Sequence, residues 1–143
     1  MTALNESFSD MASAAAQFYI NGKNDWKMGS TITKHADALR YMDDPKKDGV
    51  SIDNMRDYNP ELDAHYIMGI PNKAFYFLAT TPGWDTHKAF NIMIKANMHY
   101  WTSSMKTFSE AACGVISATK DYRYNVDDVK AAFSKVGIDT NKC

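Results

Sequence analysis

Residues 3–22 read ALNESFSDMASAAAQFYING, and this stretch decides the fold class. Its apolar residues recur at spacings of three and four, as on one face of an α-helix: Leu4, Phe8, Met11, Ala15 and Phe18. Gly22 follows as a stop signal, because glycine readily adopts the backbone conformation that ends helices. The stretch therefore predicts a helix over residues 3–20 with its apolar face against a core.

The rest of the chain extends this helical pattern. Apolar periodicity predicts a helix over residues 62–79, which Pro71 should interrupt near Ile70, and another over residues 85–102. A fourth helix should run from Thr107 or Ser109 to about Lys120, and a fifth should open at Asn125 with Asp128 and close at Gly137. Between residues 24 and 60, glycine, proline and charged pairs predict turns with short helical pieces. We expect one all-α domain over residues 1–143, with about five helices.

The composition is that of an ordinary globular protein. Of the 143 residues, 45% are hydrophobic and 23% are charged, and the formal net charge is -1. A charge this small offers no electrostatic basis for binding nucleic acid or an anionic membrane. No apolar run approaches the ~18 residues that cross a bilayer. We therefore expect neither nucleic acid nor a membrane as a partner.

The first helix carries two acids, Glu6 and Asp10, at a spacing that places them on the same face. Such a pair can ligate a metal and orient a ligand, or it can be a solvated helix face. The spacing alone favours the solvated face.

Two further places combine charged residues with functional potential. Arg40 lies among apolar neighbours, where pairing with a surface carboxylate is its simplest role. Asp63 precedes His65 by two residues, and a carboxylate there can fix the tautomer of the ring and stabilise its charged form. A helix-capping aspartate before a histidine would look the same. The other histidines stand apart from acidic clusters and are treated as ordinary residues: His35, His87 and His99.

The order of several motifs is more specific than any one of them. They are Asn-Glu-x-x-Ser-Asp at 5–10, Ala-Leu-Arg-Tyr-Met at 38–42, Asp-x-His at 63–65, Asn-x-Ala-Phe-Tyr at 72–76, Pro-Gly-Trp-Asp at 82–85, Cys-Gly-Val-Ile at 113–116 and Ala-Phe-Ser-x-Val-Gly at 132–137. Together they resemble the C-terminal part of the thermolysin family of zinc metalloendopeptidases, nearest to its pseudolysin and vibriolysin branch. The resemblance covers essentially the whole chain.

The resemblance implies a role for each candidate residue. Enzymes of this family bind zinc through two histidines of a His-Glu-x-x-His motif and a downstream glutamate, which Glu6 matches. Asp10 matches the acid that orients the first zinc histidine. His65 and Arg40 match residues that stabilise the tetrahedral intermediate and grip the substrate carbonyl, and Asp63 matches the acid that orients this histidine. Residues that match the lining of the pocket for a hydrophobic side chain just after the cleaved bond are Met28, Ile32 and Leu39.

No His-Glu-x-x-His motif occurs in this chain. The resemblance thus implies the C-terminal half of a secreted, extracellular zinc endopeptidase, whose N-terminal half supplies the other two ligands and the general base. The chain alone should be inactive. Its expected partners are polypeptide substrates and that missing half.

The cysteines and the calcium ligands add two expectations. The spacing of Cys113 and Cys143 leaves both a bridge and two free thiols open, but the pseudolysin branch has a matching disulfide, which would imply an oxidising compartment. Ala14 and Gln17 stand where pseudolysin has two calcium-binding acids, which leaves Asp25 as the visible acidic ligand. Calcium binding is therefore doubtful.

Met68 also departs from the family pattern, which usually has a serine there, and this change should affect helix packing.

Two other hypotheses compete with the peptidase interpretation. One is a non-enzymatic helical binding module, since a fold does not fix a function. The other is a hydrolase that uses Glu6 and Asp10 as an acid/base pair, which leaves Arg40 and His65 without roles. For the peptidase interpretation these four side chains must converge on one cleft. In the isolated chain that face should be uncovered, with apolar pocket residues such as Leu39 and Met28 in solvent.

Overall fold

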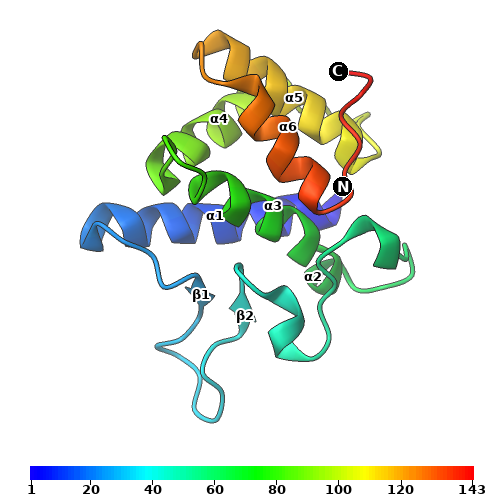
Figure 1. Ribbon diagram of the computed structural model, residues 1–143. Helices are drawn as coiled ribbons and strands as arrows, with labels where there is room; N and C mark the ends of the chain where they lie inside the picture. Colours follow the sequence, from blue (N-terminus) through cyan, green and yellow to red (C-terminus); the bar gives the residue numbers. More distant parts are fainter.

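Helix α1 (Thr2–Asn21) runs across the computed structural model, which describes all 143 residues (Figure 1). Helices α4 (Thr86–His99), α5 (Phe108–Asp121) and α6 (Val126–Lys135) lie on one side of it, and α3 (Gly69–Ala79) crosses in front of it. The opposite side carries an irregular segment with strands β1 (Lys27–Met28) and β2 (Arg40–Tyr41) and 3-10 helices Pro45–Asp48 and Met55–Asp57. The expected mainly α architecture, with five long helices, is confirmed.

Local capping explains where the long helices begin and end. Gly22 has a φ of 71° and donates its backbone N–H to the Phe18 carbonyl 2.8 Å away, which ends α1. Thr107 and Glu110 form a reciprocal capping box at the start of α5. The Asn125 side chain accepts a hydrogen bond from the backbone of Asp127 and so caps α6. The predicted starts of these two helices are confirmed.

Three details of the predicted helices are wrong. The segment expected over 62–79 is divided at Met68 into a single turn, α2 (Ala64–Ile67), and α3. Pro71 lies in the first turn of α3, where its missing N–H is not needed, so the interruption comes before it. Helix α4 ends at His99 instead of 102. Asp128 does not cap α6 but accepts a hydrogen bond from the Trp84 indole nitrogen at 2.9 Å.

The two-stranded sheet was not expected within residues 24–60. Strands β1 and β2 pair antiparallel, with Met28 opposite Arg40. The pairing continues outward through the N–H of Leu39, which donates to the Met28 carbonyl at 2.8 Å. The expected turns and short helical pieces are present as the two 3-10 helices. The hairpin fixes the position of Arg40 against α1.

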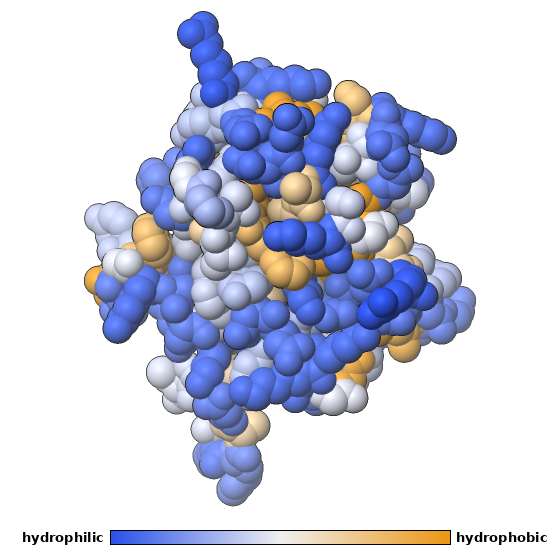
Figure 2. Space-filling view, in the orientation of Figure 1, coloured by the Kyte–Doolittle hydropathy of each residue, from blue (hydrophilic) through white to orange (hydrophobic).

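A single cluster of 28 buried hydrophobic residues forms the core between the helices. Its largest members include Met11 of α1, Phe75 of α3, Met93 of α4 and Ile116 of α5. Met68 is 1% exposed within this core, which agrees with the packing role expected for it. The face drawn in Figure 2 is mainly hydrophilic, with hydrophobic residues visible in patches near its middle.

None of the helices combines the length and the hydrophobicity required to span a bilayer.

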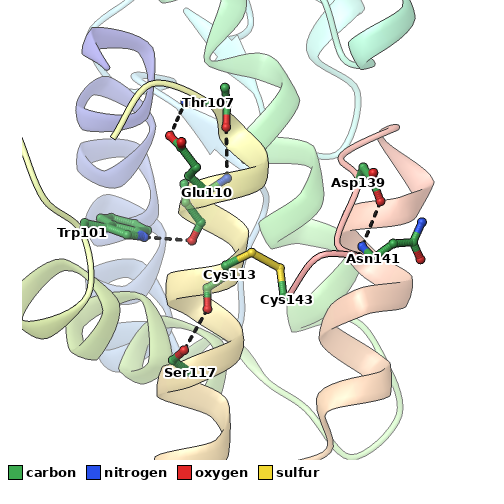
Figure 3. The surroundings of a disulfide bond; sticks show 9 residues. Trp101, Thr107, Glu110, Cys113, Ser117, Asp139, Asn141 and Cys143 are labelled. Carbon is green, nitrogen blue, oxygen red and sulfur yellow. Dashed lines mark hydrogen bonds between the residues drawn. A yellow bond between two sulfur atoms is a disulfide. The ribbon is translucent and has the colours of Figure 1, made fainter. Parts of the chain in front are cut away.

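Cys113 and Cys143 form a disulfide, as the resemblance implied (Figure 3). Cys113 lies on α5, and Cys143 ends the segment that follows α6. The bridge spans a sequence separation of 30 residues and encloses the whole of α6. It therefore fastens the end of the chain to the helical core.

An ion-pair cluster ties the irregular segment to α3. Lys73 of α3 pairs with Asp53, and Lys46 lies 3.5 Å from Asp53 and 2.8 Å from Asp57. Partial burial would raise the pKa of Asp53, but the hydrogen bond from Lys73 and the charges of Lys73 and Lys46 together lower it. Asp53 therefore stabilises the fold in its ionised form.

This cluster predicts a loss of stability in acid. Because the pKa of Asp53 is lower in the folded chain, its contribution is complete above the unfolded pKa of about 4 and disappears as pH falls through the folded value. Asp53→Asn should reduce stability at pH 7 and make the decline below about pH 4 shallower. Urea unfolding of both proteins between pH 3 and 7 measures this, and equal slopes would contradict it.

Candidate functional site

Glu6 and Asp10 lie one turn apart on α1, on the side that faces β2 and α2. The Glu6 side chain is 39% exposed and forms no ion pair with a lysine or arginine. Its Oε2 lies 3.5 Å from Nε2 of His65. The Asp10 side chain is only 7% exposed. The two acids thus share one helix face but differ in environment, since Glu6 reaches solvent and Asp10 is held inside.

Asp63 has both of the roles that its spacing from His65 left open. One carboxylate oxygen accepts the backbone N–H of His65 at 2.8 Å, which caps α2, and also lies 2.7 Å from Nδ1 of the ring. The hydrogen bonds from the backbone and the ring of His65 lower the pKa of Asp63. An ionised Asp63 accepts a hydrogen bond from Nδ1–H, and Nε2 then points toward Glu6.

Arg40 forms a bidentate ion pair with Asp10. Its Nε donates to Oδ2 at 2.9 Å and its Nη2 donates to Oδ1 at 2.8 Å. This hydrogen bonding is the main reason that the pKa of Arg40 is raised. The partner is a buried carboxylate rather than the surface carboxylate considered for it. The pair joins the hairpin to α1 and leaves the remaining nitrogen, Nη1, outside the pair.

The pocket residues are only partly where we expected them. Met28 was expected in solvent, but it is 4% exposed and belongs to the core, because the β1 strand turns it inward against the helices. Leu39 and Ile32 are exposed, at 50% and 73%. Leu39 lies against Gly29, where a Cβ would come within 2.7 Å of its side chain. Leu39 and Ile32 are therefore exposed apolar side chains on the segment that leads to Arg40.

The five polar residues gather around one face of α1 and form two groups. The residues within each group contact one another. Glu6, His65 and Asp63 form one group, and Asp10 and Arg40 form the other. No three His, Cys, Asp or Glu residues of the chain come together as a metal-binding set. Of the three carboxylates in the two groups, those of Glu6 and Asp63 are exposed.

Two residues within the quoted motifs contact this site, although the sequence predicted no role for them. Asn72 of α3 donates to Asp10 Oδ2 at 2.8 Å, and Ser7 donates to Asn72 at 2.7 Å. Both are polar residues on otherwise apolar helix faces, which is the signal that could have found them.

A cavity of about 420 Å³ lies elsewhere, at the start of α1. It is lined mainly by apolar residues, including Met1, Tyr58, Leu62 and Phe108, and includes none of the five polar residues. The polar group and this cavity are thus separate features.

On this helical scaffold, a partly exposed acid thus faces a histidine beside a buried aspartate–arginine pair. The chain matches the family described as thermolysin metallopeptidase, alpha-helical domain, over residues 2–138. It therefore belongs to this family.

Relatives support the assignment over almost the whole chain. The chain is 51% identical to a zinc metalloproteinase, MspA, of Legionella longbeachae, over 98% of its own length and 27% of that protein. It is 46% identical to a neutral protease of Vibrio proteolyticus, over 96% of its length and 22% of that protein. A bacillolysin of Bacillus cereus is 38% identical, over 95% of this chain and 27% of that protein. The chain thus spans about a quarter of the length of these relatives.

Proposed function

We propose that this chain is the helical domain of a secreted zinc endopeptidase that cleaves internal peptide bonds on the N-terminal side of hydrophobic residues. The observation that carries the proposal is the contact of Glu6 with His65, next to the Asp10–Arg40 pair, on one face of α1. The names of the relatives, which include zinc metalloproteinase and neutral protease, support the same class. The disulfide supports an oxidising, extracellular compartment.

Glu6 is the proposed zinc ligand of this domain. A carboxylate oxygen is a suitable zinc ligand, and that of Glu6 is exposed and free of lysine or arginine partners. Zinc bound there, together with two ligands from outside this chain, would polarise the substrate carbonyl and activate water. Asp10 would hold one of those outside ligands in orientation through Oδ1, which accepts only from Arg40, whereas Oδ2 accepts from both Arg40 and Asn72.

His65 and Arg40 are proposed to act on the substrate. Asp63 accepts the hydrogen bond of Nδ1–H, so in the neutral ring Nε2 carries no proton. In the charged ring Nε2 also carries a proton and can donate it in a hydrogen bond to a developing oxyanion. Arg40 keeps Nη1 free of Asp10, so it can donate to a substrate carbonyl while its ion pair holds the side chain in place. The exposed side chains of Leu39 and Ile32 would contact the hydrophobic residue after the cleaved bond.

The test compares the chain alone with a longer protein. The 143-residue chain with added zinc should bind the metal weakly and cleave no peptide, because one carboxylate cannot supply three protein ligands. Joined to a segment that carries His-Glu-x-x-His, it should cleave peptides before hydrophobic residues, and a chelator should stop the reaction. Chelator-sensitive proteolysis by the chain alone, in proportion to its amount, would contradict this division of the site.

We also propose that calcium contributes little to this domain, because hydrogen bonds hold the end of α1. Gln17 donates to Asp25 at 2.8 Å and accepts from the Asp25 N–H at 3.1 Å. Asn24 donates to the carbonyl of Ala14 at 2.7 Å and to Gln17 at 3.1 Å. We call Gln17, Asn24 and Asp25 the amide latch. Ala14 itself is fully buried, so it leaves no exposed ligand there.

Millimolar calcium should therefore raise the melting temperature of the chain by no more than about 1–2 °C. Calcium prefers carboxylates, and at a concentration near a weak Kd the gain is about 0.4 kcal/mol. Thermal melts with calcium and with a chelator measure it. Gln17→Glu restores one acid and should increase the response to calcium. A rise of about ten degrees in the unmodified chain would reveal a tight site and contradict the proposal.

A further inference from the structure

A short chain of buried hydrogen bonds lies behind Asp10. The Ser7 hydroxyl donates to Asn72 Oδ1 at 2.7 Å, and Asn72 Nδ2 donates to Asp10 Oδ2 at 2.8 Å. Ser7 is 0% exposed and Asn72 is 1% exposed. Around them α1 and α3 meet through apolar side chains of the core. An apolar pair would pack these helices without the cost of burying two polar groups, so packing alone does not account for them.

The orientation of the Asn72 amide follows from the chemistry of its partners. The Asp10 carboxylate, which is paired with Arg40, only accepts hydrogen bonds, so the amide nitrogen must face it. The amide oxygen then faces Ser7, whose hydroxyl donates. Asn72 is therefore anchored at both ends of its amide, and turning it over would lose the hydrogen bond to Asp10 and bring the amide oxygen against the carboxylate.

Asn72 is also the rigid one of the two partners that hold Asp10. Arg40 comes from a two-residue strand at the end of a loop, and its side chain is 29% exposed. Asn72 comes from the first turns of an eleven-residue helix in the core. Without Asn72, Asp10 would keep Arg40 as its only side-chain partner, and both side chains could change rotamer and open the ion pair more often. With Asn72, one carboxylate oxygen is fixed relative to α3.

We propose that Asn72, held by Ser7, is a positioning residue that sets the orientation of the Asp10 carboxylate and, through it, of the Arg40 guanidinium. The inference rests on the proposed function, in which Asp10 and Arg40 belong to the site. Residues that orient the groups around a metal typically change activity or metal affinity by about 10- to 100-fold when replaced.

The first experiment uses the zinc-loaded protease that contains this domain. Asn72→Leu keeps the volume but removes the donor, and should lower kcat/KM about tenfold or more. The matched control is Leu78→Ala in the same helix, because Leu78 is 1% exposed and takes no part in the polar chain. It should lower the melting temperature but leave kcat/KM within twofold at temperatures where the protein is folded.

Ser7→Ala provides a milder variant if Asn72→Leu does not fold. It leaves the hydrogen bond to Asp10 but removes the anchor of the amide, so kcat/KM should fall by less than in Asn72→Leu and in the same direction. If Ser7→Ala and every folded Asn72 variant lower only the melting temperature and retain kcat/KM, Asn72 is merely structural and the inference fails.

A second readout needs neither zinc nor catalysis. In NMR spectra of the 143-residue chain, the Nε–H of Arg40 should exchange with solvent more slowly than those of Arg56 and Arg123, because it donates to Asp10. Asn72→Leu should accelerate its exchange, because the ion pair would open more often, and Leu78→Ala should not. An inactive parent protease would contradict the proposed function alone. Unchanged exchange at Arg40 would contradict the positioning role alone.

Discussion

In the assembled protease, His65→Ala should lower kcat by about 10²–10³-fold with a smaller change in KM. The reason is the position of the ring, whose Nε2 faces Glu6 while Nδ1 is held by Asp63. A donor fixed in this way acts mainly on charge that develops in the transition state. Steady-state kinetics on a peptide with a hydrophobic residue after the cleaved bond measure both constants.

His99→Ala is the matched control, because His99 is an exposed histidine at the end of α4 with no contact to the site. Its kinetics should equal those of the unmodified enzyme. A His65→Ala effect confined to KM would instead assign this residue to ground-state binding.

Replacing both cysteines, as Cys113→Ser with Cys143→Ser, should lower the free energy of unfolding by roughly 3–4 kcal/mol. The disulfide closes a loop with a sequence separation of 30 residues, and without it the unfolded chain gains the freedom that this loop removes. Urea unfolding of the two proteins at the same pH gives the difference.

Two further measurements check that the loss of stability comes from the disulfide. The unmodified chain in a reductant should lose as much stability as the double variant, and alkylation of the oxidised chain should find no free thiol by mass spectrometry. A difference within about 0.5 kcal/mol, the size of an ordinary surface substitution, would show that the bridge does not stabilise the fold.

The long helices could be predicted from the sequence because each buries an apolar stripe with helical period and carries its own caps, such as Thr107 and Asn125. The hairpin could not. Its strands have two residues each, and its position depends on long-range contacts, the burial of Met28 and the pairing of Arg40 with α1. Contacts of this kind have no local sequence pattern.

The residues of the candidate site could be predicted only in part, as could the fold. The order of the motifs identified Glu6, Asp10, Arg40, Asp63 and His65 through a family resemblance, whereas the spacing of the residues alone left each open to an ordinary structural role. Asn72 and Ser7 were missed because a buried polar contact joins helices 65 residues apart in sequence. Met28 was misplaced because matching a pocket position does not reveal which way a two-residue strand turns its side chains.

The amide latch affects how inhibition of the parent enzyme by chelators should be understood. Gln17, Asn24 and Asp25 hold the end of α1 with hydrogen bonds, and under our proposal this end needs no calcium that a chelator could remove. Stripping zinc should then stop peptide cleavage while this domain stays folded. Activity lost to a chelator should return on adding zinc alone, without a refolding step and without calcium in the buffer.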